Sequence, residues 1–141
     1  MENQSVTRKK VENKLSYNNI DAALGNMGRV IPQAVDVEEA VLGAILIDAN
    51  AISIVVDSIS PTMFYREANQ LIYKTMFDLF AKSEPIDLLT VTNKLRRGKQ
   101  LELVGGASYL AALTNRVSSS ANIEYHARIV MEKFVLRLRQ Q

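Results

Sequence analysis

The sequence has no cysteine and no tryptophan, and it contains only one histidine, His126. Without cysteine the chain cannot form a disulfide scaffold, a thiol nucleophile, an iron–sulfur cluster or a cysteine-based zinc site. A single histidine excludes any site that needs two imidazoles, such as the H-E-x-x-H centre of metalloproteases. Several large classes of enzyme are therefore excluded before any motif is considered.

An excess of charge of one sign is also absent. The 141 residues include 17 Lys and Arg against 15 Asp and Glu, and a net charge of +2 is too small to indicate a nucleic-acid partner. The 48% of hydrophobic residues is enough to build the core of one domain. No apolar run approaches the roughly 20 residues of a membrane-spanning helix, and none follows the basic residues near the N-terminus. We expect an intracellular protein with no membrane partner.

Two parts of the chain differ in composition. Residues 1–29 are rich in Asn, Lys and Ser and are predicted to form a flexible N-terminal tail. Beyond them, apolar residues recur at helical spacing, and no segment alternates as a strand does. The expected fold class is all-α, with a small multi-helix head over residues 30–104 followed by an antiparallel helical hairpin over residues 105–141. The expected helices span residues 37–47, 52–59, 67–82, 88–97, a segment that begins at 105–106, and a last segment that runs to the end of the chain.

Local signals place several helix starts. Asp36, with Glu39 three residues later, is predicted to cap the first helix as a capping box. Ser60 followed by Pro61 predicts the start of a short helical turn. Asp87 is predicted to cap the helix that follows it.

The last two helices carry an apolar pattern that is typical of helix pairing. Serines 118–120 predict a very short turn between them, with Ser119 as the cap, so we expect an antiparallel hairpin. The last helix reaches Gln141 without a stop signal, which suggests a chain cut from something longer. Packing of these helices on the rest of the same domain would also explain the pattern. Periodicity alone favours this explanation and pairing with another chain about equally. The residues predicted for a self-association seam are Leu110, Leu113, Ile123, Val130, Phe134 and Leu138.

No catalytic, cofactor-binding or metal-binding site is predicted. Gly98-Lys99 does not belong to a G-x-x-x-x-G-K-[ST] phosphate loop, because Asn93 replaces the first glycine and Gln100 replaces the Ser or Thr. Gly98 is better interpreted as the C-terminal cap of a helix. His126 has no partner in triad-like order, and we expect a hydrogen-bonded surface histidine.

An ordered set of short segments resembles the N-terminal domain of the bacterial replicative DNA helicase family, DnaB. Each segment is weak alone, but their order and spacing are specific to the family, and the set covers the chain from Pro32 to the C-terminus. The segments are PQAVDVEEAVLG (32–43), FYR (64–66), LIY (71–73), PIDLLT (85–90), LELVGGA (101–107), YLA (109–111), SAN (120–122) and IEYHARIV (123–130).

This resemblance implies a non-catalytic domain of an ATP-dependent helicase that acts in DNA replication. In the family such domains pair and assemble as a trimer of dimers, which forms a collar on a hexameric ring and docks the C-terminal domain of primase. A helicase loader is a further expected partner. ATP and Mg²⁺, and most DNA contacts, are expected in a following RecA-like domain joined by a linker, and no cofactor is expected here. The resemblance implies a cytoplasmic protein at the nucleoid and the replication fork.

A stand-alone helical protein that binds DNA, or a regulator of the helicase-loader type, is the alternative. It would use the basic residues of the last helix, and it predicts DNA binding that weakens steeply as salt is added. The residues involved would be Arg128, Lys133, Arg137 and Arg139.

Overall fold

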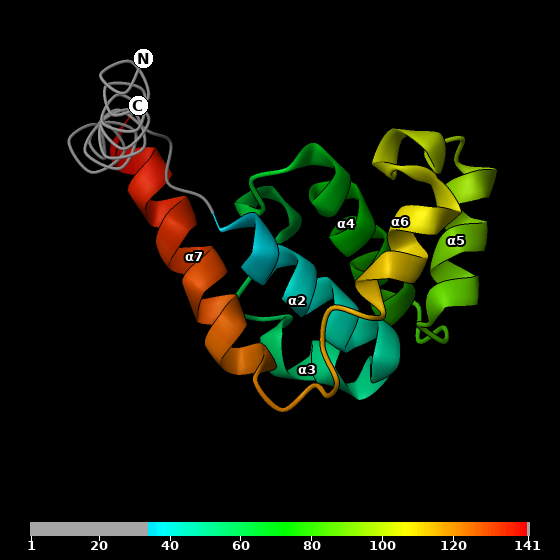
Figure 1. Ribbon diagram of the computed structural model, residues 1–141, viewed down its shortest axis with the longest axis horizontal. Coiled ribbons are helices and arrows are strands. Elements are labelled where there is room, and N and C mark those ends of the chain that lie inside the picture. The colour runs from blue at the N-terminus through cyan, green and yellow to red at the C-terminus, as the bar shows by residue number, and fades with distance from the viewer. Residues whose placement is uncertain (1–33, 141) are drawn as a thin grey trace, which may run out of the picture. The chain divides into compact units, whose positions relative to one another are not determined.

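The computed structural model describes residues 34–140, which contain helices and loops and no strand (Figure 1). The predicted all-α class is therefore confirmed for this part of the chain. The tail predicted for residues 1–29 lies outside the described residues. In chain order the elements are α2 (Val35–Ile47), the 3-10 turn η1 (Ala49–Ala51), α3 (Ile52–Val55), the 3-10 turn η2 (Pro61–Met63), α4 (Glu67–Ala81), α5 (Leu88–Arg97), the 3-10 turn η3 (Glu102–Val104), α6 (Gly106–Leu113) and α7 (Ile123–Arg139).

Helix α2 is the centre of the core. Its residues 40–46 are all buried, so it is apolar on nearly every side, as expected for a helix enclosed by others. It packs against α4, α6 and α7, and these three surround it in Figure 1. Gly43 permits the close approach of α6, because a Cβ added there would overlap the carbonyl oxygen of Leu113.

Two of the predicted helix starts are confirmed. The Asp87 carboxylate accepts the backbone N–H of Thr90 at 2.8 Å, and the Thr90 hydroxyl accepts the backbone N–H of Asp87 at 2.9 Å. This reciprocal pair is a capping box built from residues three apart. The turn η2 begins at Pro61 directly after Ser60, as predicted.

The predicted cap of the first helix is wrong. Helix α2 begins at Val35 with Ala34 in the cap position, so Asp36 lies inside the first turn. The Asp36 carboxylate is directed to Arg116 at 2.9 Å, a partner that is far away in sequence. Glu39 likewise pairs with Arg116, at 3.0 Å. Both carboxylates that were expected to form a local capping box therefore pair with Arg116, a residue remote in sequence.

The predicted hairpin of the last two helices is not formed. Residues 114–122 connect α6 to α7, so the linking segment is not a very short turn. Each helix packs on α2, and Figure 1 shows α6 and α7 well apart. The capping role of Ser119 is also wrong, because α7 begins at Ile123 after Asn122 and has no side-chain cap. The neighbouring Ser120 hydroxyl donates to Asp48 at 2.7 Å and anchors the linker beside the end of α2.

The physical reason is the apolar surface of α2. Leu110 and Leu113 of α6, and Ile123, Ala127 and Val130 of α7, belong to one core with α2. Because α2 is apolar on nearly every side, α6 and α7 each bury more apolar surface by packing on α2 than they would by packing on each other. The described parts of the predicted head and hairpin, residues 34–104 and 105–140, therefore share one compact unit.

Candidate functional site

The described residues present polar, charged and apolar side chains at the surface of the unit. Within residues 34–140, no group of three or more His, Cys, Asp or Glu side chains is placed to hold a metal ion. No helix in that range is long and apolar enough to cross a membrane. His126 is half-buried, and its ring centroid lies 5.8 Å from that of Tyr125. Three surface features can instead serve as interaction sites: a polar cluster on α2, α4 and α6, the outer face of α7, and a pocket between α4 and α5.

The polar cluster is organised by the buried carboxylate of Glu38. Its oxygens accept the backbone N–H groups of Tyr65 at 2.6 Å and of Arg66 at 3.4 Å, and the side-chain amide of Asn69 at 3.0 Å. Arg66 is the residue before α4, and it provides no side-chain cap for that helix. The negative charge of Glu38 therefore takes the place of a local cap at the positive end of the α4 dipole. This buried interaction fixes the start of α4 against α2.

The Tyr109 hydroxyl connects this buried carboxylate to the surface. It lies 2.7 Å from the side-chain oxygen of Asn69 and 3.0 Å from the carboxylate of Glu39, and its single proton is shared between these two acceptors. The orientation of the Asn69 amide is set by Glu38, which requires a donor from it. Burial, followed by the charge of Glu39, raises the pKa of Tyr109 well above its usual range. Tyr109 therefore remains a neutral donor.

Exposed charges cover the outer side of the cluster. The Arg66 guanidinium lies over the Tyr109 ring, 5.3 Å from its centroid, and 3.9 Å from Glu39. Arg116 bridges Glu39 and Asp36 at 3.0 and 2.9 Å. The Asp36 side chain is 90% exposed, and the two arginine side chains are more than 40% exposed. The cluster thus has a buried polar base and a surface of both charge signs that water and a partner can reach.

The cluster brings together segments that carry the family resemblance. Glu38 and Glu39 come from the segment at 32–43, Arg66 ends the segment at 64–66, and Tyr109 begins the segment at 109–111. The sequence predicted Glu39 as part of a capping box, and the contacts of both glutamates were missed. The spacing of the segments was the available signal, but it does not show which side chains meet.

The six residues predicted for self-association fall into two groups. Leu110, Leu113, Ile123 and Val130 are between 0% and 2% exposed in the core of their own chain. They are not available to a second chain, so their assignment to an interface is wrong. The cause is again α2, which covers the face that periodicity identified as apolar. Phe134 is half-buried, and Leu138 is 49% exposed.

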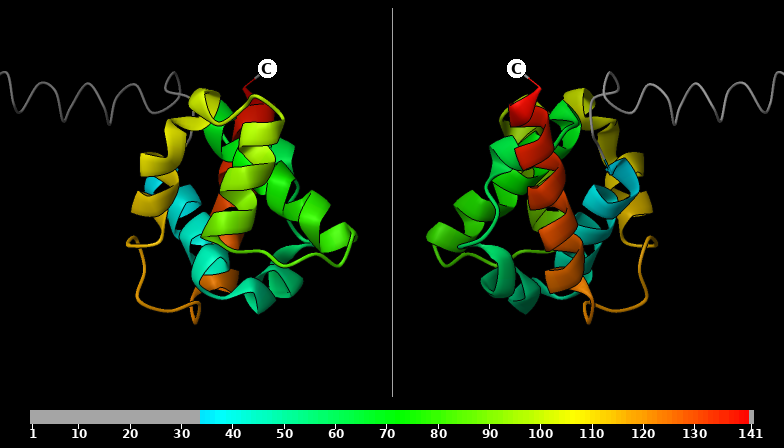
Figure 2. Two further views of the ribbon diagram at one scale, coloured as in Figure 1. Left: turned by 90° about the vertical axis from the view of Figure 1, so that its right-hand side faces the viewer. Right: turned by 90° about the vertical axis from the view of Figure 1, so that its left-hand side faces the viewer.

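The outer face of α7 has apolar side chains that are partly exposed. Val135, Leu136 and Leu138 are 40%, 39% and 49% exposed. A shallow hollow of about 440 Å³ lies among residues of this face, namely Met131, Glu132, Val135, Leu136 and Arg139. Figure 2 shows α7 on the outside of the unit, in front of the other helices in the right-hand view. Apolar residues at the end of a surface helix, flanked by charges, are typical of a helix that pairs with another chain.

The basic residues proposed for DNA binding do not act as one surface. The Arg137 guanidinium donates to the carbonyl of Met63 at 2.7 Å and lies over the rings of Tyr65 and Phe134. Arg128 lies 4.0 Å from Glu124 one turn earlier on the same helix. Part of the positive charge of α7 is therefore used within the chain.

The fold of the described residues defines a small all-helical domain. The sequence pattern of the family described as "DnaB-like helicase N terminal domain" matches residues 30–132. The chain belongs to this family. Its resemblance to DnaB, noted from the ordered segments, is therefore confirmed.

Known relatives and a solved structure agree with this assignment. The chain is 49% identical over 111 residues to the replicative DNA helicase DnaB of Rhodothermus marinus, a match that covers 79% of this chain and 12% of the relative. It is 46% identical over 109 residues to that of Geobacillus stearothermophilus, covering 77% of this chain and 24% of the relative. The chain therefore spans at most about a quarter of these curated relatives.

The structural match is to the crystal structure of the N-terminal domain of DnaB helicase from Mycobacterium tuberculosis. The TM-score is 0.74 and the sequence identity is 41%, and the match covers 77% of this chain and 75% of that one. The helical arrangement around α2 is thus the fold of a DnaB N-terminal domain.

Proposed function

We propose that this chain is the non-catalytic collar domain of a replicative DNA helicase, which assembles with copies of itself and docks primase. The observation that carries the proposal is the exposed apolar face of the C-terminal half of α7. Val135 and Leu136 lie side by side in sequence at the centre of this face, with Glu132 on one side and Arg139 on the other. This arrangement supports pairing with a second copy of the same helix.

The pattern of charges favours an antiparallel pair. In a two-fold symmetric pair centred between Val135 and Leu136, each Glu132 faces the Arg139 of the other copy. The same symmetry places Val135 of one copy opposite Leu136 of the other. An interface of this kind must be complementary to itself, and the lining of the hollow satisfies this requirement. Pairs formed in this way would be the units of a larger ring.

The polar cluster around Tyr109 is the second surface, and we assign it to primase docking. Asp36, Arg66 and Arg116 present both charge signs above a fixed hydrogen-bonded base. Partly exposed charges of this kind set the orientation of a partner and the rate at which it associates. The outer face of α7 is apolar, so the two surfaces are suited to different partners. A helicase loader would be a further partner of the collar.

The remaining activities belong to the whole helicase. ATP and Mg²⁺ would be bound by a RecA-like domain that follows this one, and DNA would be moved mainly by that domain. We do not assign DNA binding to α7, because Arg137 and Arg128 are engaged within the chain. No retardation of DNA at low salt is expected, whereas retardation lost on Lys133→Glu would favour the DNA-binding alternative.

Sedimentation velocity over a range of protein concentrations tests self-association. The unsubstituted chain should sediment as a dimer or a larger assembly at high concentration, and Leu136→Asp should shift it to monomer because a charge is buried in the interface. Leu89→Asp is the matched control, since Leu89 is 68% exposed on α5 and should leave the assembly unchanged. A chain that remains monomeric at every concentration would contradict the proposal.

Calorimetric titration with the C-terminal domain of primase tests the second surface. Arg116→Glu should weaken binding, because it reverses the charge that pairs with Asp36 and Glu39. Leu136→Asp separates the two roles, since the monomer should still bind primase if one polar cluster is sufficient. Primase binding that is unaffected by Arg116→Glu would contradict the assignment.

A further inference from the structure

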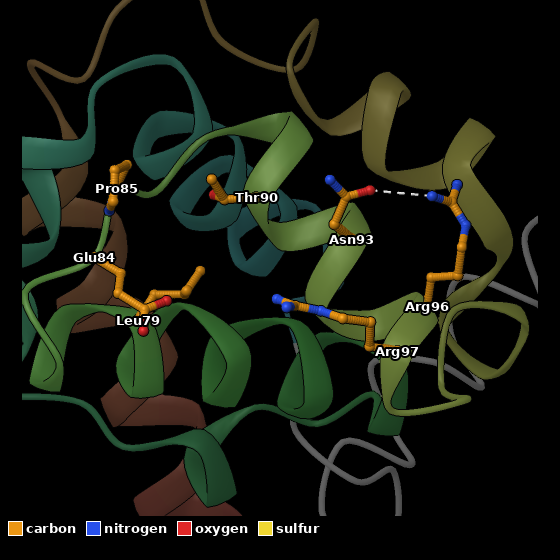
Figure 3. Close-up of a pocket in the computed structure, with 7 residues that line it drawn as sticks. All are labelled: Leu79, Glu84, Pro85, Thr90, Asn93, Arg96 and Arg97. Carbon is orange, nitrogen blue, oxygen red and sulfur yellow. Dashed lines mark hydrogen bonds between the residues drawn. The ribbon is translucent and has the colours of Figure 1, made fainter.

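A pocket of about 390 Å³ lies between α4 and α5, apart from the two surfaces described above (Figure 3). Its apolar part consists of Leu79 and Pro85. Figure 3 shows the side chain of Arg97 directed across the pocket toward Leu79 and Glu84, and Arg96 at the far end, where it donates to Asn93 at 3.0 Å. A volume of this size is within the range of sites that bind small ligands or side chains.

Both ends of the pocket are formed where a helix stops. Helix α4 ends with Ser83 at φ 58°, and Glu84 donates its N–H to the carbonyl of Leu79 at 2.9 Å. Helix α5 ends in the same way, with Lys99 at φ 58° and Gln100 donating to Leu95 at 2.8 Å. These left-handed endings close the last turn of each helix and hold the backbone around the pocket in place.

The positive charges around the pocket have no acidic partner among residues 34–140. Arg96 and Arg97 lie between Lys94 and Lys99, so residues 94–99 carry four positive charges. No acidic group in residues 34–140 forms an ion pair with any of them. Arg66, Arg116 and Arg128, in contrast, all have acidic partners. Arg97 is exposed, and its guanidinium lies beside an apolar surface with hydrogen-bond donors available to an anion.

We propose that this pocket docks an acidic segment of another protein. A carboxylate of the segment binds the Arg97 guanidinium, which presents two parallel N–H donors suited to that group. A neighbouring aliphatic side chain of the segment packs on the exposed Pro85, next to the small part of Leu79 that lines the pocket. Glu84, on the opposite wall in Figure 3, repels a second carboxylate and so sets the direction of the segment. The site requires neither pairing of α7 nor the cluster around Tyr109.

A single-stranded nucleic acid fits the pocket less well. Nucleic-acid channels combine positive charge with aromatic rings on which bases stack, and none of the described residues that line this pocket is aromatic. The apolar surface is aliphatic and is suited to a leucine or valine side chain. Positive charge beside an aliphatic surface therefore favours an acidic peptide.

Fluorescence anisotropy with a labelled peptide, four aspartates around one leucine, tests the proposal. The full chain should bind it, and Arg97→Glu should weaken binding by at least about tenfold, because one charged hydrogen-bonded pair is replaced by repulsion. Glu84→Gln should tighten binding, since a like charge is removed. Arg128→Glu, on α7, is the control and should bind as the unsubstituted chain does. An α-helical circular dichroism spectrum confirms that each variant is folded.

Three outcomes would overturn the proposal. They are no binding of the peptide at low salt, equal loss of binding with Arg97→Glu and Arg128→Glu, and tighter binding of a labelled oligothymidylate than of the peptide. Sedimentation of Arg97→Glu separates this site from the proposed collar function. The variant should assemble as the unsubstituted chain does, and a failure of α7 pairing would leave peptide binding intact.

Discussion

The carboxylate of Glu38 accepts the backbone N–H of Tyr65 at 2.6 Å, across an interval of 27 residues. Through this contact a buried charge on the central helix α2 holds the start of α4. Because Glu38 is only 2% exposed, its charge is compensated by the N–H groups around it and not by water. The position of α4, and with it one wall of the polar cluster, depends on this side chain.

Glu38→Gln should therefore destabilise the fold. The amide removes the charge and turns an N–H group toward one of the donors that the carboxylate now accepts. The expected loss is about 2–4 kcal/mol in the free energy of unfolding, measured by urea denaturation. Glu67→Gln, in the exposed first turn of α4, is the control and should change stability by less than about 0.5 kcal/mol. Equal effects of the two changes would show that Glu38 has no special role.

Gly43→Ala should disrupt the contact between α2 and α6. The added methyl would overlap the carbonyl oxygen of Leu113, which is backbone and cannot turn away. Overpacking of this kind costs about 1–3 kcal/mol, again measured by urea denaturation. Gly98→Ala is the matched control, because the nearest atom to a Cβ there is 3.5 Å away. If Gly43→Ala leaves the free energy of unfolding unchanged, α2 and α6 can move apart without loss of stability.

The alkaline limit of stability should depend on Tyr109. Burial raises its pKa in the folded chain above the ordinary value of 10.0, so the folded state holds the proton more tightly than the unfolded state. The resulting stabilisation is complete below the unfolded pKa and is lost as the pH rises through the folded pKa. Stability should therefore fall as the pH rises from about 10 upward. Burial raises the pKa of Tyr73 in the same way, and its hydroxyl donates to the carbonyl of Ile59 at 3.0 Å.

Tyr109→Phe isolates this contribution. At neutral pH it should cost about 1–3 kcal/mol, because the fully buried side-chain oxygen of Asn69 loses its donor. Between pH 9 and pH 11 its stability should fall less than that of the unsubstituted chain, since one of the two buried hydroxyls is gone. Tyr125→Phe is the control, because Tyr125 is 61% exposed. An unchanged dependence on pH in Tyr109→Phe would contradict this role.

Lys99→Gly should stabilise the chain. Lys99 has φ 58°, a left-handed conformation that glycine adopts without steric cost. Relief of this strain should exceed the added entropy of the unfolded chain, and a gain of about 0.5–1 kcal/mol is expected. Thermal unfolding measured at two salt concentrations checks this and separates the loss of charge from the backbone effect. A lower midpoint at both concentrations would show that the lysine side chain stabilises this turn.

Sequence reasoning succeeded where both partners of a contact are local. Asp87 caps a helix that begins at the next residue, so the local sequence was enough to predict the cap, although not the reciprocal bond with Thr90. The bounds of α4 and α5 were predicted well because apolar periodicity and the residues at the helix ends are also local features. Asp36 and Glu39 show the opposite case, because Arg116, which is remote in sequence, determines where both carboxylates lie.

The self-association site could be predicted only in part. Periodicity correctly identified Val130 and Ile123 as members of an apolar face, but it does not say what covers that face. In the folded chain α2 covers it, and the apolar surface that remains exposed consists of Val135 and Leu136, which lie outside the predicted seam, and Leu138, which belongs to it. The proposed pairing of Glu132 with Arg139 of a second copy could be inferred only once the exposed side of α7 was known.

A charge-reversal cycle on α7, read by sedimentation velocity, tests the central claim most directly. Glu132→Arg alone and Arg139→Glu alone should each weaken dimerisation, because each places like charges opposite one another in an antiparallel pair. The double variant should recover most of the association of the unsubstituted chain. Single variants that assemble normally, or a double variant weaker than either, would contradict self-assembly through α7.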